Sequence, residues 1–114
     1  MKVAVIGSRG FTDYELVKNT LSKMDISLVV SGSAMGADRL GEQYAEENSI
    51  PTKIFLPDWE RLGKGAGIIR NTDIINECEI VVAFWDNESR GTLDSINKAK
   101  KLGKKLIIIN YELT

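Results

Sequence analysis

The sequence contains no histidine and only one cysteine, Cys78. The absence of histidine excludes a histidine general base, and with it the Cys–His and Ser–His nucleophile pairs. One cysteine without any histidine also excludes the usual zinc sites and an intramolecular disulfide. Any chemistry in this chain must therefore use carboxylates, arginine, lysine, hydroxyl groups or the backbone.

Long apolar runs and an excess of basic charge are missing too. The longest apolar stretches, such as Ile80–Trp85 and Leu106–Ile109, are too short to span a bilayer. A strand-like segment begins at Val3, so we expect no signal peptide and a cytoplasmic location. The formal net charge is −1, whereas proteins that bind nucleic acid usually carry a clear basic excess. We therefore expect no membrane partner and no binding of nucleic acid, whether sequence-specific or not.

The chain does have enough apolar residues for one core. It has 114 residues, of which 43% are hydrophobic, and this predicts a single domain over residues 1–114. Short segments rich in Val and Ile predict strands at Val3–Ile6, Leu28–Ser31, Thr52–Leu56, Ile80–Trp85 and Leu106–Ile109. Because these segments are mostly apolar on both faces, they are typical of a sheet that is covered on both sides.

Helical patterns lie between the predicted strands. Apolar residues at helical spacing begin at Tyr14, Ala37, Ile68 and Leu93. Thr12–Asp13 is suited to cap the first helix, while Asn48 and Gly103 are suited to end the second and the fourth. The alternation predicts an α/β fold: a Rossmann-like three-layer α/β/α sandwich with a five-stranded parallel sheet in the order 3-2-1-4-5. Pro57–Gly67 is then the longest irregular connection.

Glycine, hydroxyl and arginine residues gather after the predicted strands, at the sheet edge where ligands of such folds bind. Glycine allows the backbone to approach a ligand, and the helix that follows offers free N–H groups to an anion. Arginine adds a fork of donors that suits phosphate. The predicted ligand-binding residues are Gly7, Ser8, Arg9, Ser31, Gly32, Ser33, Gly36, Asp38, Gly67, Arg70, Asn71, Trp85, Ser89, Arg90, Gly91 and Thr92. No loop matches the dinucleotide fingerprint or the Walker A pattern.

Purely structural roles are open for the same residues. Gly7 and Gly32 fit tight turns between a strand and a helix. Asp38 favours the start of a helix, and Arg70 is spaced to pair with Asp73. Arg9, Lys64 and Arg90 fit solvated surface positions as well as they fit a ligand site. Trp59 and Trp85 fit packing in the core or at its rim better than stacking on a base. The concentration of these residues on one edge is thus a stronger signal than any one of them.

Several short motifs also occur in an order that is typical of one family. They are Val5–Arg9, Ser31–Asp38, Asp58–Trp59, Gly67–Asn71 and Ala83–Trp85 followed by Ser89–Thr92. Together they resemble the YspA-like branch of the SLOG superfamily, over nearly the whole chain. The resemblance implies a Rossmann-like fold that binds a nucleotide or a nucleotide-derived ligand. It also implies that the chain can form a homo-oligomer.

The Lonely Guy enzymes of the same superfamily are phosphoribohydrolases. They use an arginine on a helix and a glutamate that follows a Gly-Gly-x-Gly-Thr loop. Arg70 loosely matches that arginine and Gly91–Thr92 matches the end of the loop, but Glu88–Ser89 replaces the paired glycines. The position of the glutamate falls on Ser95, and a serine cannot supply the charge that cleavage of an N-glycosidic bond requires.

Three functions remain open from the sequence. The first is a sensor or binding protein for a nucleotide, ADP-ribose or a similar small molecule. The second is a hydrolase of nucleotides or their derivatives, with Asp38 as the leading carboxylate and Glu88 and Asp94 as further candidates. The third is a sequestering or adaptor protein that traps a nucleotide signal or binds a protein. The missing glutamate favours the first, and we expect no metal and no cofactor.

Overall fold

Strands and helices alternate along the part of the chain that the computed structural model describes, residues 1–111. The strands are β1 (Lys2–Gly7), β2 (Leu28–Ser31), β3 (Thr52–Ile54), β4 (Ile80–Trp85) and β5 (Lys105–Asn110). The helices are α1 (Tyr14–Leu21), α2 (Ala37–Glu47), α3 (Trp59–Leu62), α4 (Ala66–Glu77) and α5 (Arg90–Lys101), and a 3₁₀ turn, η1 (Gly63–Gly65), joins α3 to α4.

The strands form one parallel sheet in the order β3-β2-β1-β4-β5, which confirms the predicted fold and strand order. The central strand β1 pairs with β2 on one side and with β4 on the other. In this register Gly7 lies opposite Phe84. The chain therefore adds β2 and β3 on one side of β1, and β4 and β5 on the other side. The loops that follow β1 and β4 consequently lie next to each other.

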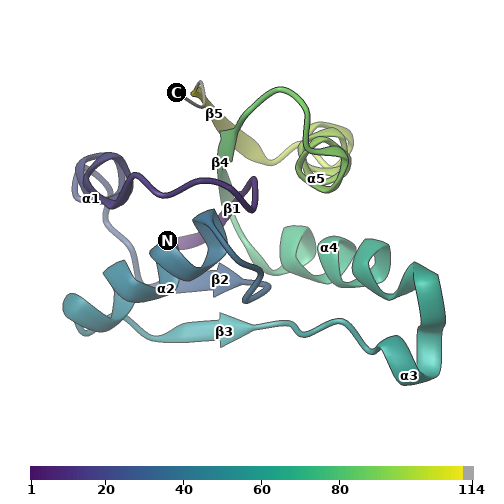
Figure 1. Cartoon of the computed structure of the whole chain (residues 1–114). Helices are drawn as coiled ribbons and strands as arrows, with labels where there is room; N and C mark the ends of the chain where they lie inside the picture. Colours follow the sequence, from purple (N-terminus) through teal and green to yellow (C-terminus); the bar gives the residue numbers. More distant parts are fainter. Residues whose placement is uncertain (112–114) are drawn as a thin grey trace.

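Each face of the sheet has its own hydrophobic core. Val3 and Val5 of β1 pack with residues of α1 and α2, whereas Ala4 and Ile6 face the other way and pack with residues of α4 and α5. This follows from the alternation of side chains along a strand. Figure 1 shows α1 and α2 on one side of the sheet and α4 and α5 on the other, so the molecule has the three expected layers.

The predicted helix ends agree with the structure. Asp13 is the N-cap of α1, and its carboxylate accepts a hydrogen bond from the amide of Leu16. Asn48 ends α2, and Gly103 follows the end of α5 with a φ of +68°. Among residues 1–111 no helix is both long and apolar enough to cross a bilayer.

Two details of the predicted fold were wrong. The third strand ends at Ile54 and not at Leu56, and Pro57–Gly67 is not irregular throughout because α3 and η1 lie within it. The edge strands are also less covered than predicted: every residue of β3 is exposed, and Ile107 and Ile108 of β5 keep more than a third of their surface. Helices of this small domain reach across the central strands but do not enclose the edges.

Candidate functional site

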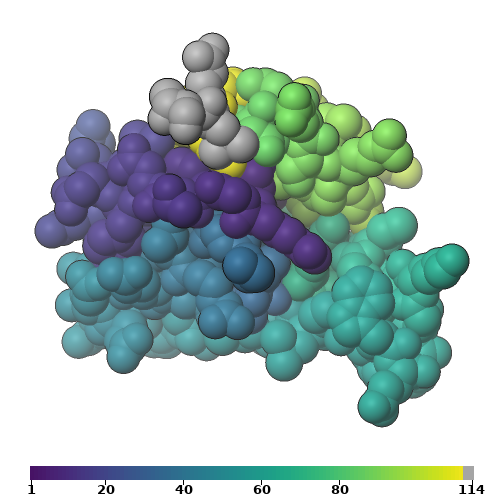
Figure 2. Space-filling model, in the orientation of Figure 1, coloured from purple at the N-terminus to yellow at the C-terminus, as the bar shows by residue number. Residues whose placement is uncertain are grey.

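A cavity of about 110 Å³ lies at the carboxyl ends of the central strands. Its walls come from β1 and the loop after it, the loop between β2 and α2, the middle of α4 and the start of α5. On the face shown in Figure 2, the purple segment after β1 and the teal segment that leads into α4 occupy adjoining parts of the surface. The lining residues are Ile6, Gly7, Arg9, Ala34, Asp38, Arg70, Asn71, Ile74, Ser89, Gly91, Thr92 and Ser95.

Half of the predicted ligand-binding residues line this cavity. Those that do are Gly7, Arg9, Asp38, Arg70, Asn71, Ser89, Gly91 and Thr92. Those that do not are Ser8, Ser31, Gly32, Ser33, Gly36, Gly67, Trp85 and Arg90. Of the three candidate catalytic carboxylates only Asp38 is a lining residue; Glu88 and Asp94 lie outside. The fold thus brings residues from four separate segments to one place, as the sequence predicted, but the set is smaller.

Arg70 reaches from α4 to the loop that follows β2. Its Nη1 donates to the carbonyl oxygen of Gly32 at 2.9 Å, and its Nε donates to Oδ1 of Asn71 at 3.0 Å. Two of its five N–H groups are thereby used, and the others remain available to a ligand. Among the ion pairs within residues 1–111 there is none between Arg70 and Asp73, although their spacing left such a pair open.

Gly32 makes room for this arginine. A Cβ atom at Gly32 would overlap Nη1 of Arg70 and lie 2.9 Å from its Cζ. The backbone there is not in the left-handed region, so the missing side chain reflects the close approach of the guanidinium. Gly32 therefore allows Arg70 its position in the cavity wall, although Gly32 itself does not line the cavity.

Replacing Gly32 with alanine should displace the guanidinium and leave the fold intact, because the end of a flexible side chain can move aside. Affinity for an anionic nucleotide such as ADP-ribose should fall on the order of tenfold, through loss of one charge-assisted hydrogen bond. Isothermal titration calorimetry measures this. Gly65→Ala is the matched control, since a Cβ at Gly65 meets no atom within 4 Å. Equal affinities for the two variants would contradict the role given to Gly32.

Asp38 is a buried carboxylate, with 6% of its surface exposed. Its Oδ2 accepts hydrogen bonds from the amides of Gly32 at 3.2 Å and Ala34 at 3.3 Å. Burial raises the pKa of Asp38 to about 6, although these two amides and the charge of Arg70 oppose the shift. Asp38 does more than favour the start of α2, because it also fixes the loop after β2 and presents a carboxyl group to the cavity.

The loop after β1 is fixed by contacts with its two neighbours. The amide of Ser8 donates to the carbonyl of Phe84, and its Oγ accepts from the amide of Asp86. Gly36 has a φ of +86°, and a Cβ there would overlap the carbonyl oxygen of Ser8. Ser8 and Gly36 therefore hold the loop in place for Gly7 and Arg9 and do not themselves face the cavity.

Hydrogen bonds between side chains and backbone amides also fix the start of α5. Oδ1 of Asp86 accepts hydrogen bonds from the amides of Glu88 and Ser89, and these bonds hold the pKa of Asp86 below its usual range. Ser89 is the N-cap, and its Oγ accepts from the amide of Thr92. The first amides of a helix have no acceptor within it, and no acceptor for those of Arg90 and Gly91 lies in residues 1–111. This helix end is thus suited to an anion.

Other predicted residues have structural partners elsewhere. The hydroxyl groups of Ser31 and Ser33 both donate to the carboxylate of Glu42, at 2.9 and 2.7 Å. Trp85 packs against the core, and its Nε1 donates to the carbonyl of Ser89. Arg90 is the first residue of α5 and is exposed. Within residues 1–111 no group of three acidic or cysteine residues is placed to hold a metal ion.

Sequence reasoning missed four lining residues, Ile6, Ala34, Ile74 and Ser95. Ser95 could have been identified from the sequence, because the resemblance to the Lonely Guy enzymes implies that their glutamate would fall at this position. The structure puts Ser95 in the wall of the cavity with 3% of its surface exposed. Ser95 thus contributes a neutral hydroxyl group to the wall of the cavity.

Comparisons with known proteins agree with this fold. The model of the YspA, cpYpsA-related SLOG family matches residues 1–62. The Gene 61 protein of Mycobacterium phage D29 is 29% identical over 121 residues, which cover 96% of this chain and 95% of that protein. DNA processing protein A (DprA) from Streptococcus pneumoniae matches with a TM-score of 0.81 and 22% identity, over 98% of this chain and 51% of its own. The chain thus spans about half the length of DprA, and this likeness shows the fold.

Proposed function

Because the chain belongs to the YspA, cpYpsA-related SLOG family, we propose that it binds a nucleotide or a nucleotide-derived small molecule in the cavity beside Arg70. The observation that carries the proposal is the position of this guanidinium. It is held from two sides, by Gly32 and Asn71, and it lines the same cavity as Gly91 and Thr92 at the start of α5. A phosphate placed there meets the free donors of arginine and the unpaired amides of a helix end.

The size of the cavity limits which part of the ligand enters it. Its volume of about 110 Å³ is smaller than the roughly 300–1,000 Å³ of pockets that enclose a whole drug-sized ligand. A phosphate with part of its sugar fits such a volume, and the rest of the nucleotide lies outside along the rim. Arg9 is exposed at that rim, where it supplies a further positive charge.

Mass spectrometry of small molecules released from the purified protein tests this function, together with calorimetry using ADP-ribose, AMP and inorganic phosphate. We expect a nucleotide-like molecule to be carried or bound, with tighter binding of the nucleotides than of phosphate alone. A sensor or binding protein returns the ligand chemically unchanged. Purified protein that carries no such molecule and binds none of the three probes would exclude the proposed function.

The buried carboxyl group of Asp38 favours a hydrolase as the second candidate. A carboxyl group with a pKa near 6 that faces a cavity is suited to general acid or base chemistry. Chromatography of nucleotides incubated with the protein decides between the candidates. A hydrolase would release the free base or phosphate with turnover, and Asp38→Asn would abolish this release while binding persists.

A further inference from the structure

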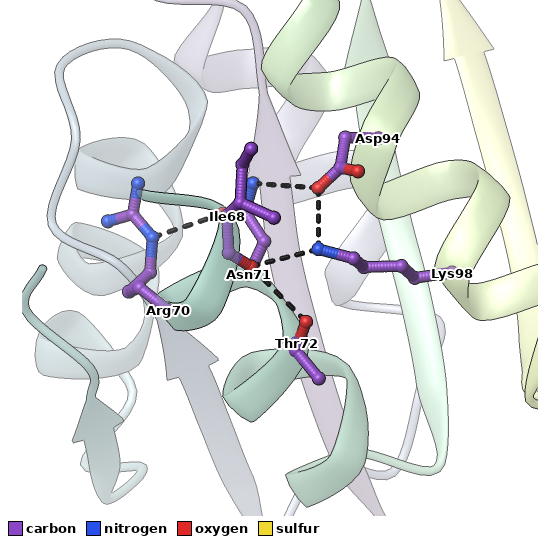
Figure 3. Close-up of polar contacts among 6 residues, drawn as sticks. All are labelled: Ile68, Arg70, Asn71, Thr72, Asp94 and Lys98. Atoms are coloured by element: carbon purple, nitrogen blue, oxygen red, sulfur yellow. Dashed lines mark hydrogen bonds and ion pairs between the residues drawn. The ribbon is translucent and has the colours of Figure 1, made fainter. Parts of the chain in front are cut away.

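A chain of polar contacts connects α5 to Arg70. Nζ of Lys98 donates to Oδ2 of Asp94 at 2.8 Å, and Nδ2 of Asn71 donates to the same oxygen at 3.4 Å. Oδ1 of Asn71 then accepts from Nε of Arg70 at 3.0 Å. Figure 3 shows these side chains in sequence, with Lys98 and Asp94 on α5 and with Asn71 between them and Arg70. The chain thus runs from one helix to the guanidinium on the other.

Each contact determines the direction of the next one. An ionised carboxylate only accepts hydrogen bonds, so Asp94 turns the NH₂ group of Asn71 toward itself. The oxygen of the same amide must then face Arg70, where it accepts from Nε. Lys98 also donates to the carbonyl oxygen of Ile68 at 2.8 Å, which ties the first turn of α4 to α5. The orientation of the guanidinium therefore depends on residues far from its own tip.

We propose that Asn71, Asp94 and Lys98 are positioning residues for Arg70, an assignment that rests on the proposed function of the cavity. Asp94 and Lys98 do not line the cavity, so they act through Asn71 and not by touching the ligand. This gives Asp94 a role different from that of a catalytic carboxylate. The pair at 2.8 Å is partly exposed, with 22% and 34% of the side-chain surfaces of Lys98 and Asp94 accessible. Its effect is therefore on geometry more than on stability.

Calorimetry with ADP-ribose on the Asp94→Ala variant tests the effect on binding. We expect the affinity for ADP-ribose to fall on the order of tenfold. Without Asp94 the side-chain amide of Asn71 can rotate, so it no longer orients the guanidinium of Arg70 for its charge-assisted hydrogen bond to the ligand. Lys98→Met, which keeps most of the aliphatic side chain, should act in the same direction. Asp73→Ala is the control, since Asp73 is an exposed acid on α4 and makes no hydrogen bond or ion pair with residues 1–111.

A double variant shows whether Asp94 acts through Asn71. If it does, Asn71→Leu with Asp94→Ala should bind ADP-ribose no more weakly than Asn71→Leu alone. Additive losses would mean that Asp94 contributes to binding by another route, and this would overturn the proposal.

A measurement without ligand separates this proposal from the proposed function. The Nε–H signal of Arg70 in a ¹⁵N spectrum, assigned by its loss in Arg70→Lys, should exchange faster with water in Asp94→Ala than in Asp73→Ala. Unchanged exchange would overturn the positioning role even if ADP-ribose binds. Faster exchange supports the positioning role even if none of the nucleotide probes binds, in which case only the proposed function fails.

Discussion

Replacing Arg70 with alanine should weaken the binding of ADP-ribose about 100-fold, the largest loss expected from any single side chain of the cavity. The guanidinium of Arg70 lies in the cavity wall, where its hydrogen bonds to Gly32 and Asn71 hold it in place. Hydrogen bonds from arginine to a phosphate are charge-assisted, and losing one or two of them costs about 3 kcal/mol. Isothermal titration calorimetry at moderate salt measures the change.

Arg61→Ala is the matched control for this variant. Arg61 lies on α3, is largely exposed and pairs with Asp58. It does not line the cavity, so its removal changes the net charge equally without touching the cavity. Arg70→Lys should retain part of the affinity, because lysine keeps the charge but lacks the planar fork. If Arg70→Ala binds as tightly as Arg61→Ala does, Arg70 is not part of the ligand site.

The stability of the Asp38→Asn variant, relative to the wild type, should increase by about 2 kcal/mol between pH 4 and pH 7. The folded protein holds the proton of Asp38 up to a pKa of about 6, whereas an unfolded chain releases it near pH 4. Between these values the unfolded state binds fewer protons than the folded state, so the wild type loses stability as the pH rises. Asparagine does not titrate, and its oxygen can still accept from the amides of Gly32 and Ala34.

Urea unfolding of both proteins across this pH range gives the difference. Asp86→Asn provides a contrast of opposite sign, because hydrogen bonds hold the pKa of Asp86 below its usual range. That variant should lose stability relative to the wild type as the pH rises from the lowered pKa of folded Asp86 to the unfolded value near 4, so the unfolding series for this variant is extended below pH 4. Arg70→Ala should raise the pKa of Asp38 further, since the guanidinium opposes the shift. A difference between Asp38→Asn and wild type that does not vary with pH would contradict the burial of a titrating carboxyl group.

The order of the strands was predictable because hydrophobic pattern and chain topology determine it together. Segments that are apolar on both faces, such as Ile80–Trp85, must lie inside a parallel sheet. The short helix at Trp59–Leu62 was not predictable in this way, since four residues are too few to show a period. The end of β3 at Ile54 depends on pairing with β2, which propensity alone does not reveal.

The cavity itself was predictable only in outline. Sequence order placed Arg70 and Gly91 on the correct edge of the sheet, but hydroxyl groups that look free in a sequence have partners in the fold. Ser31 and Ser33 illustrate this, because both donate to Glu42. Asp38 and Glu42 are four residues apart and so share one face of α2. From that spacing one could have predicted that Asp38 and Glu42 both point toward the loop after β2.

The strand order also determines when the cavity forms during synthesis. The central strand β1 is made first, but its neighbour β4 comes late, with Val3 opposite Ile80. While the ribosome is still producing the second half, β1 has an unpaired edge, and Ala4 and Ile6 lack the cover of α4 and α5. Such edges and apolar faces are prone to aggregation, and parallel pairing across a long separation is slow. A nascent chain therefore has no complete cavity until the first turns of α5 have left the ribosome.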